Sequence, residues 1–186
     1  MLVRSRLGNA AGLALAMACI GLAACGGAAG PKLPIATRVC RDDLHAVRRM
    51  VGAASLQIAN RDPANIECVV SSGGLRLHVV AQANAQAWTE FDTLVVHQAQ
   101  GFEGSTANSA SMPQDLAGLG YNAAWIPADS KLLATNGSQS QGGSFVTVAA
   151  AGSPPPGTSK LRLAQAVATA TLASAPRGPN PGPPPS

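Results

Sequence analysis

The segment 75–79 alternates strictly between apolar and polar side chains, and this pattern limits the possible folds more than any other part of the chain. Successive side chains of a strand point to opposite faces, so its leucines and valine face one way while Arg76 and His78 face the other. Segment 66–70 alternates in the same manner, and the Ser-Ser-Gly-Gly segment 71–74 joins the two as a turn. These strands predict an antiparallel sheet with one buried face and one wetter face.

Apolar residues at helical spacing predict three helices around this hairpin. They cover residues 41–51, 85–98 and 159–174, and Thr158 or Ser159 is expected to cap the last of them. Three further strands are expected within 115–127, at 131–135 and at 144–149. The sequence therefore predicts an α+β domain: an antiparallel sheet of about five strands with helices packed on one face, in the order α-β-β-α-β-β-β-α.

Local features add detail to this outline. Asp42 and Asp43 would lie in the first turn of the first helix, where carboxylates meet the positive end of the helix dipole. The predicted second helix carries Trp88 in a chain with only 3% aromatic residues, so we expect that helix at the centre of the core. Residues 61–65 have the composition of a turn, and residues 100–111 are expected to form a mobile polar loop.

The first 24 residues have the features of an export signal. Arg4 and Arg6 precede an apolar run, 13–22, that is too short for a bilayer span of about 20 apolar residues. The run ends in Leu-Ala-Ala-Cys at 22–25, and this segment resembles the signal of bacterial lipoproteins. The resemblance implies that the Cys25 thiol carries diacylglycerol and that cleavage precedes it. The alternative is an ordinary signal that leaves Cys25 as a free thiol.

Composition divides the chain into four parts, 1–24 being the lipoprotein signal peptide. A flexible tether rich in Gly, Ala and Pro covers 25–38, a single α+β domain covers 39–174, and a Pro-rich tail expected to be disordered covers 175–186. The 162 residues after the signal, 186 less 24, suffice for one domain with a core. They carry 11 basic residues (13 less two) and nine acidic ones, so we expect no nucleic-acid partner.

Two cysteines remain in the predicted domain, Cys40 and Cys68. An even number of cysteines in an exported protein predicts a disulfide. It would close a loop of roughly 30 residues and stabilise the fold by about 3 kcal/mol on the loop-entropy model. The alternative is two buried free thiols. Two cysteines so far apart, with no neighbouring histidine, do not make a zinc pattern.

The sequence offers little catalytic chemistry. His45, His78 and His97 are scattered, without metal-binding spacing, and are interpreted as surface or structural residues. We find no nucleophile elbow, phosphate-binding loop or dinucleotide fingerprint, and no carboxylate pair placed for glycoside chemistry. We therefore expect no catalytic residues, no metal and no cofactor.

Residues 39–174 carry a further set of features: Cys40 at the first helix, Cys68 on the first strand, and a Gly-Leu-Gly-x-x-Ala segment at 118–123 before Trp125. A hairpin and a C-terminal amphipathic helix follow. In this the chain resembles a family of actinobacterial lipoproteins known only as a domain of unknown function. The resemblance implies an α+β domain on the outer face of the plasma membrane, with no established activity.

These features predict a lipoprotein held at the membrane through Cys25 and facing the extracytoplasmic side. We expect a non-catalytic binding module for a lipid or a small apolar ligand, held in a groove between sheet and helices. The alternative is a protein-interaction role, as an accessory subunit of a cell-envelope complex. The first helix also has a small basic face, interpreted as a solvated surface with contact to anionic headgroups as the alternative; its arginines are Arg38, Arg41, Arg48 and Arg49.

Overall fold

The computed structural model of the chain describes residues 33–100, 111–138 and 140–179. The chain divides into two units, Met1–Lys32 and Leu33–Ser186, and all described helices and strands belong to the second. In chain order they are α1 (Ile35–Val51), β1 (Ser55–Asp62), β2 (Asn65–Ser72), β3 (Leu75–Asn84), α2 (Ala87–Gln100), β4 (Gln114–Asp115), β5 (Asn122–Ile126), β6 (Lys131–Thr135), β7 (Gly143–Ala151) and α3 (Lys160–Ser174).

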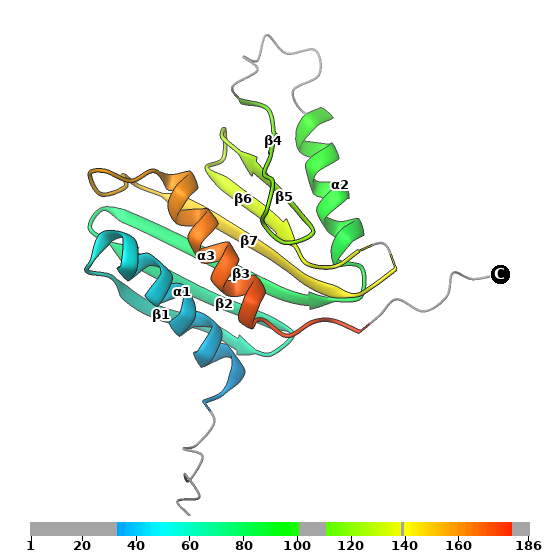
Figure 1. Cartoon of the computed structure of the whole chain (residues 1–186), viewed down its shortest axis with the longest axis horizontal. Coiled ribbons are helices and arrows are strands. Elements are labelled where there is room, and N and C mark those ends of the chain that lie inside the picture. Colours follow the sequence, from blue (N-terminus) through cyan, green and yellow to red (C-terminus); the bar gives the residue numbers. More distant parts are fainter. Residues whose placement is uncertain (1–32, 101–110, 139, 180–186) are drawn as a thin grey trace, which may run out of the picture. The chain divides into compact units, whose positions relative to one another are not determined.

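The strands form one antiparallel sheet of seven strands in the order β1-β2-β3-β7-β6-β5-β4 (Figure 1). It consists of two meanders, β1–β3 and β4–β7, joined where β3 pairs with β7. The predicted α+β class is confirmed, but the predicted count of five strands is wrong. The additional strands gave weak signals, because β1 has only Leu56 and Ile58 on its buried side and β4 has two residues.

Helices α1 and α3 lie side by side on one face of the sheet and cover its β1–β3 half and centre (Figure 1). The side chains beneath them come from the alternating strands: Leu75, Leu77 and Val79 are at most 1% exposed. Each fully buried side chain of this size contributes about 1.5–3 kcal/mol of transfer free energy. The buried face predicted from the alternation in 75–79 is therefore the main core of the protein.

Helix α2 packs on the opposite face, so the prediction that all helices lie on one face is wrong. Its Phe91 joins a second apolar cluster with Leu133 and Phe145. Almost every residue of β5 and β6 is buried, unlike the alternating residues of β3. Because these two strands carry apolar side chains on both faces of the sheet, both faces have to be covered by helices. Helix α2 is also peripheral rather than central, because Trp88 stays partly exposed.

Helix α1 begins at Ile35, six residues before the predicted start, so the tether does not extend to residue 38. Pro34 precedes the first turn, where a missing backbone N–H costs nothing. The apolar stripe continues upstream of residue 41 through Ala36, Val39 and Cys40. Asp43 and its neighbour therefore lie inside the helix and not in its first turn.

The start of the predicted disordered tail belongs to the fold. Ser144 Oγ donates to the Pro176 carbonyl at 2.7 Å, and the Gly178 N–H donates to the Gly143 carbonyl at 3.0 Å. Two hydrogen bonds to β7 hold the segment because its prolines favour the extended backbone that lies along a strand. The predicted signal, most of the predicted tether, residues 101–110 of the predicted mobile loop and residues 180–186 lie outside the described residues.

Several local predictions are confirmed. The strand 131–135 has the expected bounds. The β2–β3 hairpin turns at Gly73, whose φ of 58° is a left-handed conformation that favours glycine. Ser159 caps α3, because its side chain accepts a hydrogen bond from the Arg162 N–H at 3.2 Å.

Candidate functional site

One half of the sheet is covered on a single face only. Strands β5–β7 carry α2 on the face opposite α1 and α3. Helix α2 meets β3 near Asn84 at its end, so β1, β2 and most of β3 have no helix there in the described structure. Figure 1 shows α2 at one end of the sheet and α1 over the other. The uncovered face presents the polar side chains of β3, Arg76 and His78, as their alternation predicts.

This open face contains a hollow of about 310 Å³. Its shape follows from the sheet register: Ala149 on β7 lies between His78 on β3 and Lys131 on β6. A short side chain between two long ones leaves space above it. Ala151 lies beside Arg76 in the same way. The residues that line the hollow are Val69, Arg76, His78, Asp129 and Ala149–Ala151.

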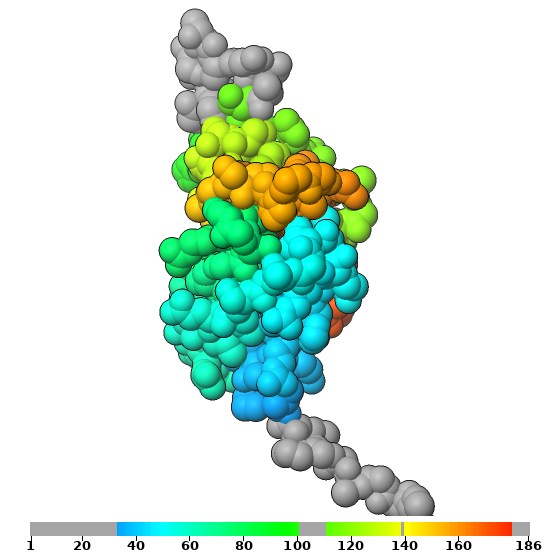
Figure 2. Space-filling view, turned by 90° about the vertical axis from the view of Figure 1, so that its left-hand side faces the viewer, coloured from blue at the N-terminus to red at the C-terminus, as the bar shows by residue number. Residues whose placement is uncertain are grey.

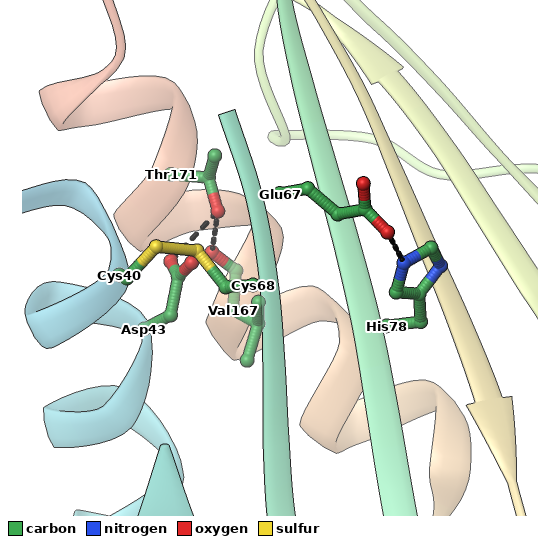
Figure 3. The surroundings of a disulfide bond; sticks show 7 residues. All are labelled: Cys40, Asp43, Glu67, Cys68, His78, Val167 and Thr171. Carbon is green, nitrogen blue, oxygen red and sulfur yellow. Dashed lines mark hydrogen bonds and ion pairs between the residues drawn. A yellow bond between two sulfur atoms is a disulfide. The ribbon is translucent and has the colours of Figure 1, made fainter. Parts of the chain in front are cut away.

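The imidazole in this hollow is oriented by a neighbouring strand. His78 Nε2 lies 2.5 Å from Glu67 Oε1 on β2 (Figure 3). Both side chains are partly exposed, so the pair contributes less than about 1 kcal/mol to stability. Its effect is to fix the direction of the ring at one wall of the hollow.

The lining combines an apolar floor with charged walls. Val69 and Ala149 supply apolar contact, while the Arg76 guanidinium can donate several hydrogen bonds in a planar fork. The lining residues include no hydroxyl or thiol nucleophile. Such a surface suits a small ligand that has an apolar part and a group that accepts hydrogen bonds.

Of the predicted site residues, Cys40 and Cys68 are joined as expected. Their disulfide links α1 to β2, with the Cα atoms 5.7 Å apart and a sequence separation of 28 (Figure 3). Cys25 lies outside the described residues. His45 and His97 are exposed, and among the described residues no group of three or more His, Cys, Asp and Glu side chains could hold a metal ion.

A buried carboxyl beside the disulfide is the feature that the sequence analysis missed. Asp43 on α1 is 0% exposed and faces α3 (Figure 3). Its Oδ1 lies 2.7 Å from Thr171 Oγ1, and its Oδ2 has no hydrogen-bond partner. The available signal was its position in the α1 stripe, three residues after Cys40 and four before Val47.

Burial raises the pKa of Asp43 from 3.8 to about 7, against the lowering effect of its Thr171 hydrogen bond and with a small increase from the Asp42 charge. The hydroxyl of Thr171 also lies 2.9 Å from the Val167 carbonyl. One hydroxyl proton cannot serve both acceptors fully. In the protonated form the Asp43 carboxyl can donate to the Thr171 hydroxyl, which then donates to the Val167 carbonyl. Each of these two protons then has an acceptor.

Comparison with family models, with curated proteins and with solved structures gives no match for this chain. The resemblance to actinobacterial lipoproteins therefore stays a prediction. In the part of the chain that the structure describes, no helix has both the length and the apolar character that a membrane span requires.

Proposed function

We propose that this protein is a lipoprotein anchored through Cys25 on the outer side of the plasma membrane, and that its domain binds a small ligand without converting it. The signal sequence supports the anchor. The hollow on the uncovered half of the sheet is the observation that carries the binding function. The proposed ligand has an apolar part that contacts Val69 and Ala149 and an acceptor group near Arg76.

The close packing of the domain interior supports a ligand site on the open face of the sheet. The layer between the sheet and helices α1 and α3 is filled by side chains such as Val39, Leu77 and Val167, all at 0% exposed. A close-packed layer gives a ligand no room without displacing side chains. We therefore place the ligand on the open face rather than in the groove between helices and sheet.

Filling the hollow tests this proposal. In Ala149→Phe a ring occupies the space above β7, and we expect at least a tenfold weaker affinity for anilinonaphthalene sulfonate, which pairs an apolar ring system with an anion. Stability should change by less than about 1 kcal/mol, because the side chain points outward. The measurement is a fluorescence titration of the chain from residue 25 onward with Cys25→Ser.

Ala59→Phe, at an exposed position on β1, is the matched control and should bind the dye like the parent chain. Native mass spectrometry of tagless protein from several hosts tests for a ligand that copurifies. Equal dye binding by the two Phe variants, together with empty protein from every host, would contradict the proposed site.

Cys25→Ser tests the anchor separately. The thioether to diacylglycerol cannot form on serine, so we expect the protein to leave the membrane pellet and to lose the mass of the lipid. Globomycin should block processing of the parent chain. Cys19→Ser, within the predicted signal, is the control that should remain membrane-bound. A Cys25→Ser protein that still fractionates with membranes would rule out this anchor.

The alternative role, as an accessory subunit of an envelope complex, is supported by apolar side chains around α2. Leu94, Val96, Met112 and Tyr121 are 38%, 44%, 39% and 62% exposed, respectively. Exposed apolar groups at one end of a domain are typical of protein contact sites. Cross-linking in native membranes should capture a reproducible neighbour that Leu94→Lys loses, whereas the absence of any such neighbour would argue against this role.

A further inference from the structure

The outward side of α1 is a basic stripe. Buried residues such as Val39 and Val47 fix which side of α1 meets the sheet, so the opposite side faces solvent (Figure 2). Its exposed basic residues repeat at a spacing of three or four and share that face. They are Arg38, Arg41, His45, Arg48 and Arg49.

Helix α2 and strand β4, at the other end of the sheet, carry acidic residues and no lysine or arginine. No lysine or arginine occurs between Arg76 and Lys131. In that interval α2 carries Glu90 and Asp92, and β4 carries Asp115. The sheet order puts α2 and β4 far from β1, over which α1 packs. The basic end of the domain is therefore at α1, and acidic residues lie on α2 and β4 away from it.

The basic end is also the end to which the predicted anchor is attached. Nine residues, 26–34, separate Cys25 from the start of α1 at Ile35. At about 3.6 Å per residue, a fully extended linker of this length spans at most roughly 35 Å. Through this linker α1 is held close to any bilayer that contains the Cys25 lipid.

We propose that the basic stripe of α1 docks on anionic phospholipid headgroups, so that α1 faces the bilayer and the α2 end faces away. The inference rests on the proposed anchor, which brings α1 to the membrane. Arg38, Arg41 and Arg49 make the contact. Arg48 does not, because its guanidinium donates from two nitrogens to the Ala54 carbonyl, at 2.9 and 3.1 Å, and so holds the end of the helix.

The surface next to the stripe suits a headgroup. A hollow of about 320 Å³ lies between α1 and α3, with Arg49 and His45 on its α1 side and alanines 170 and 173 on its α3 side. Small side chains there let a phosphate approach the guanidinium closely. Asp42 also lines the hollow and offsets one charge, but the face keeps a net positive charge from its four arginines.

Vesicle binding of the chain from residue 25 onward with Cys25→Ser tests this inference without the lipid. The core residues of the described structure and the disulfide all lie after residue 33, so we expect this chain to retain the fold. We expect flotation with vesicles of phosphatidylglycerol and phosphatidylcholine in equal parts, little with phosphatidylcholine only, and loss of binding at high salt, where charges are screened. A basic residue at an anionic surface is worth about fivefold in affinity, so Arg38→Gln/Arg41→Gln/Arg49→Gln should bind at least tenfold more weakly.

Arg61→Gln/Lys131→Gln/Arg177→Gln is the matched control, since it removes the same charge from β1, β6 and the segment after α3, outside the basic stripe. It should weaken binding by less than threefold. Equal losses in the two triple variants, or no binding of the parent to anionic vesicles, would overturn the docking surface, whereas the fractionation of Cys25→Ser decides the anchor independently. Circular dichroism of each variant confirms that the fold is kept.

Discussion

Replacing Asp43 with Asn is expected to destabilise the protein at pH 4 and to stabilise it at pH 8. The folded pKa of about 7 lies above the unfolded value of 3.8. Below 3.8 both states hold the proton. Between 3.8 and 7 only the folded state holds it, so the free energy of unfolding of the parent falls as pH rises and levels off above 7. This group lowers stability by about 4 kcal/mol across that range.

Asparagine removes that slope because it does not ionise. At pH 8 it replaces a buried carboxylate, and we expect a gain of about 2 kcal/mol after the cost of two buried amide N–H groups without acceptors. At pH 4 it replaces a neutral acid that makes a hydrogen bond, and we expect a loss of about 1–2 kcal/mol. Urea unfolding at pH 4, 6 and 8, with the disulfide intact, measures both.

Asp42→Asn is the control for this experiment. Asp42 is the preceding residue on α1 and is partly exposed, so its replacement should change stability by less than about 0.5 kcal/mol at either pH. Curves of stability against pH that run parallel for the parent and Asp43→Asn would show that the buried carboxyl does not titrate as its surroundings require.

Removing the disulfide as Cys40→Ala/Cys68→Ala is expected to cost about 3 kcal/mol through the unfolded state, plus roughly 1 kcal/mol for the buried sulfur atoms. The bond ties α1 to β2 across 28 positions, and both side chains are at most 1% exposed. For a domain of this size the loss corresponds to a fall of about 10 °C in Tm. Calorimetry in a Cys25→Ser background measures it.

The denaturant m-value, which reports the surface exposed on unfolding, provides the control. A reduced chain unfolds to a more open ensemble, so the denaturant m-value should rise in the double variant. Val70→Ala removes a buried side chain from the same strand and should cost about 2 kcal/mol with no change in m. Equal m-values and a Tm within 2 °C of the parent would mean that the disulfide does not restrain the unfolded chain.

The main face of the core could be predicted because local alternation and global burial agree there. In β3 the apolar positions 75, 77 and 79 are all buried, and the two-residue turn before them fixes the register with β2. The disulfide could be predicted because only two cysteines remained once Cys19 was assigned to the predicted signal and Cys25 to the predicted lipid anchor. In both cases the information lies within a short stretch or in a simple count.

The position of α2 and the strand β1 could not be predicted in the same way. Residues 87–100 have a helical pattern, but nothing in them tells which face of the sheet they cover. That depends on strands that begin 22 or more residues after the helix ends, whose apolar side chains lie on both faces. An edge strand such as β1, with two apolar positions, is recognised only by its partner β2.

The sequence by itself determined the α+β class, the antiparallel hairpin and the cysteine pair, because each is written in local spacing or composition. Only the tertiary structure decided the open face with its hollow, the burial of Asp43 between α1 and α3, and the separation of the basic end from the acidic residues of α2 and β4. These depend on the register of non-adjacent strands and on helix packing, since a side chain's environment is set by residues distant in the chain. The candidate site lies where those long-range contacts leave part of the sheet uncovered.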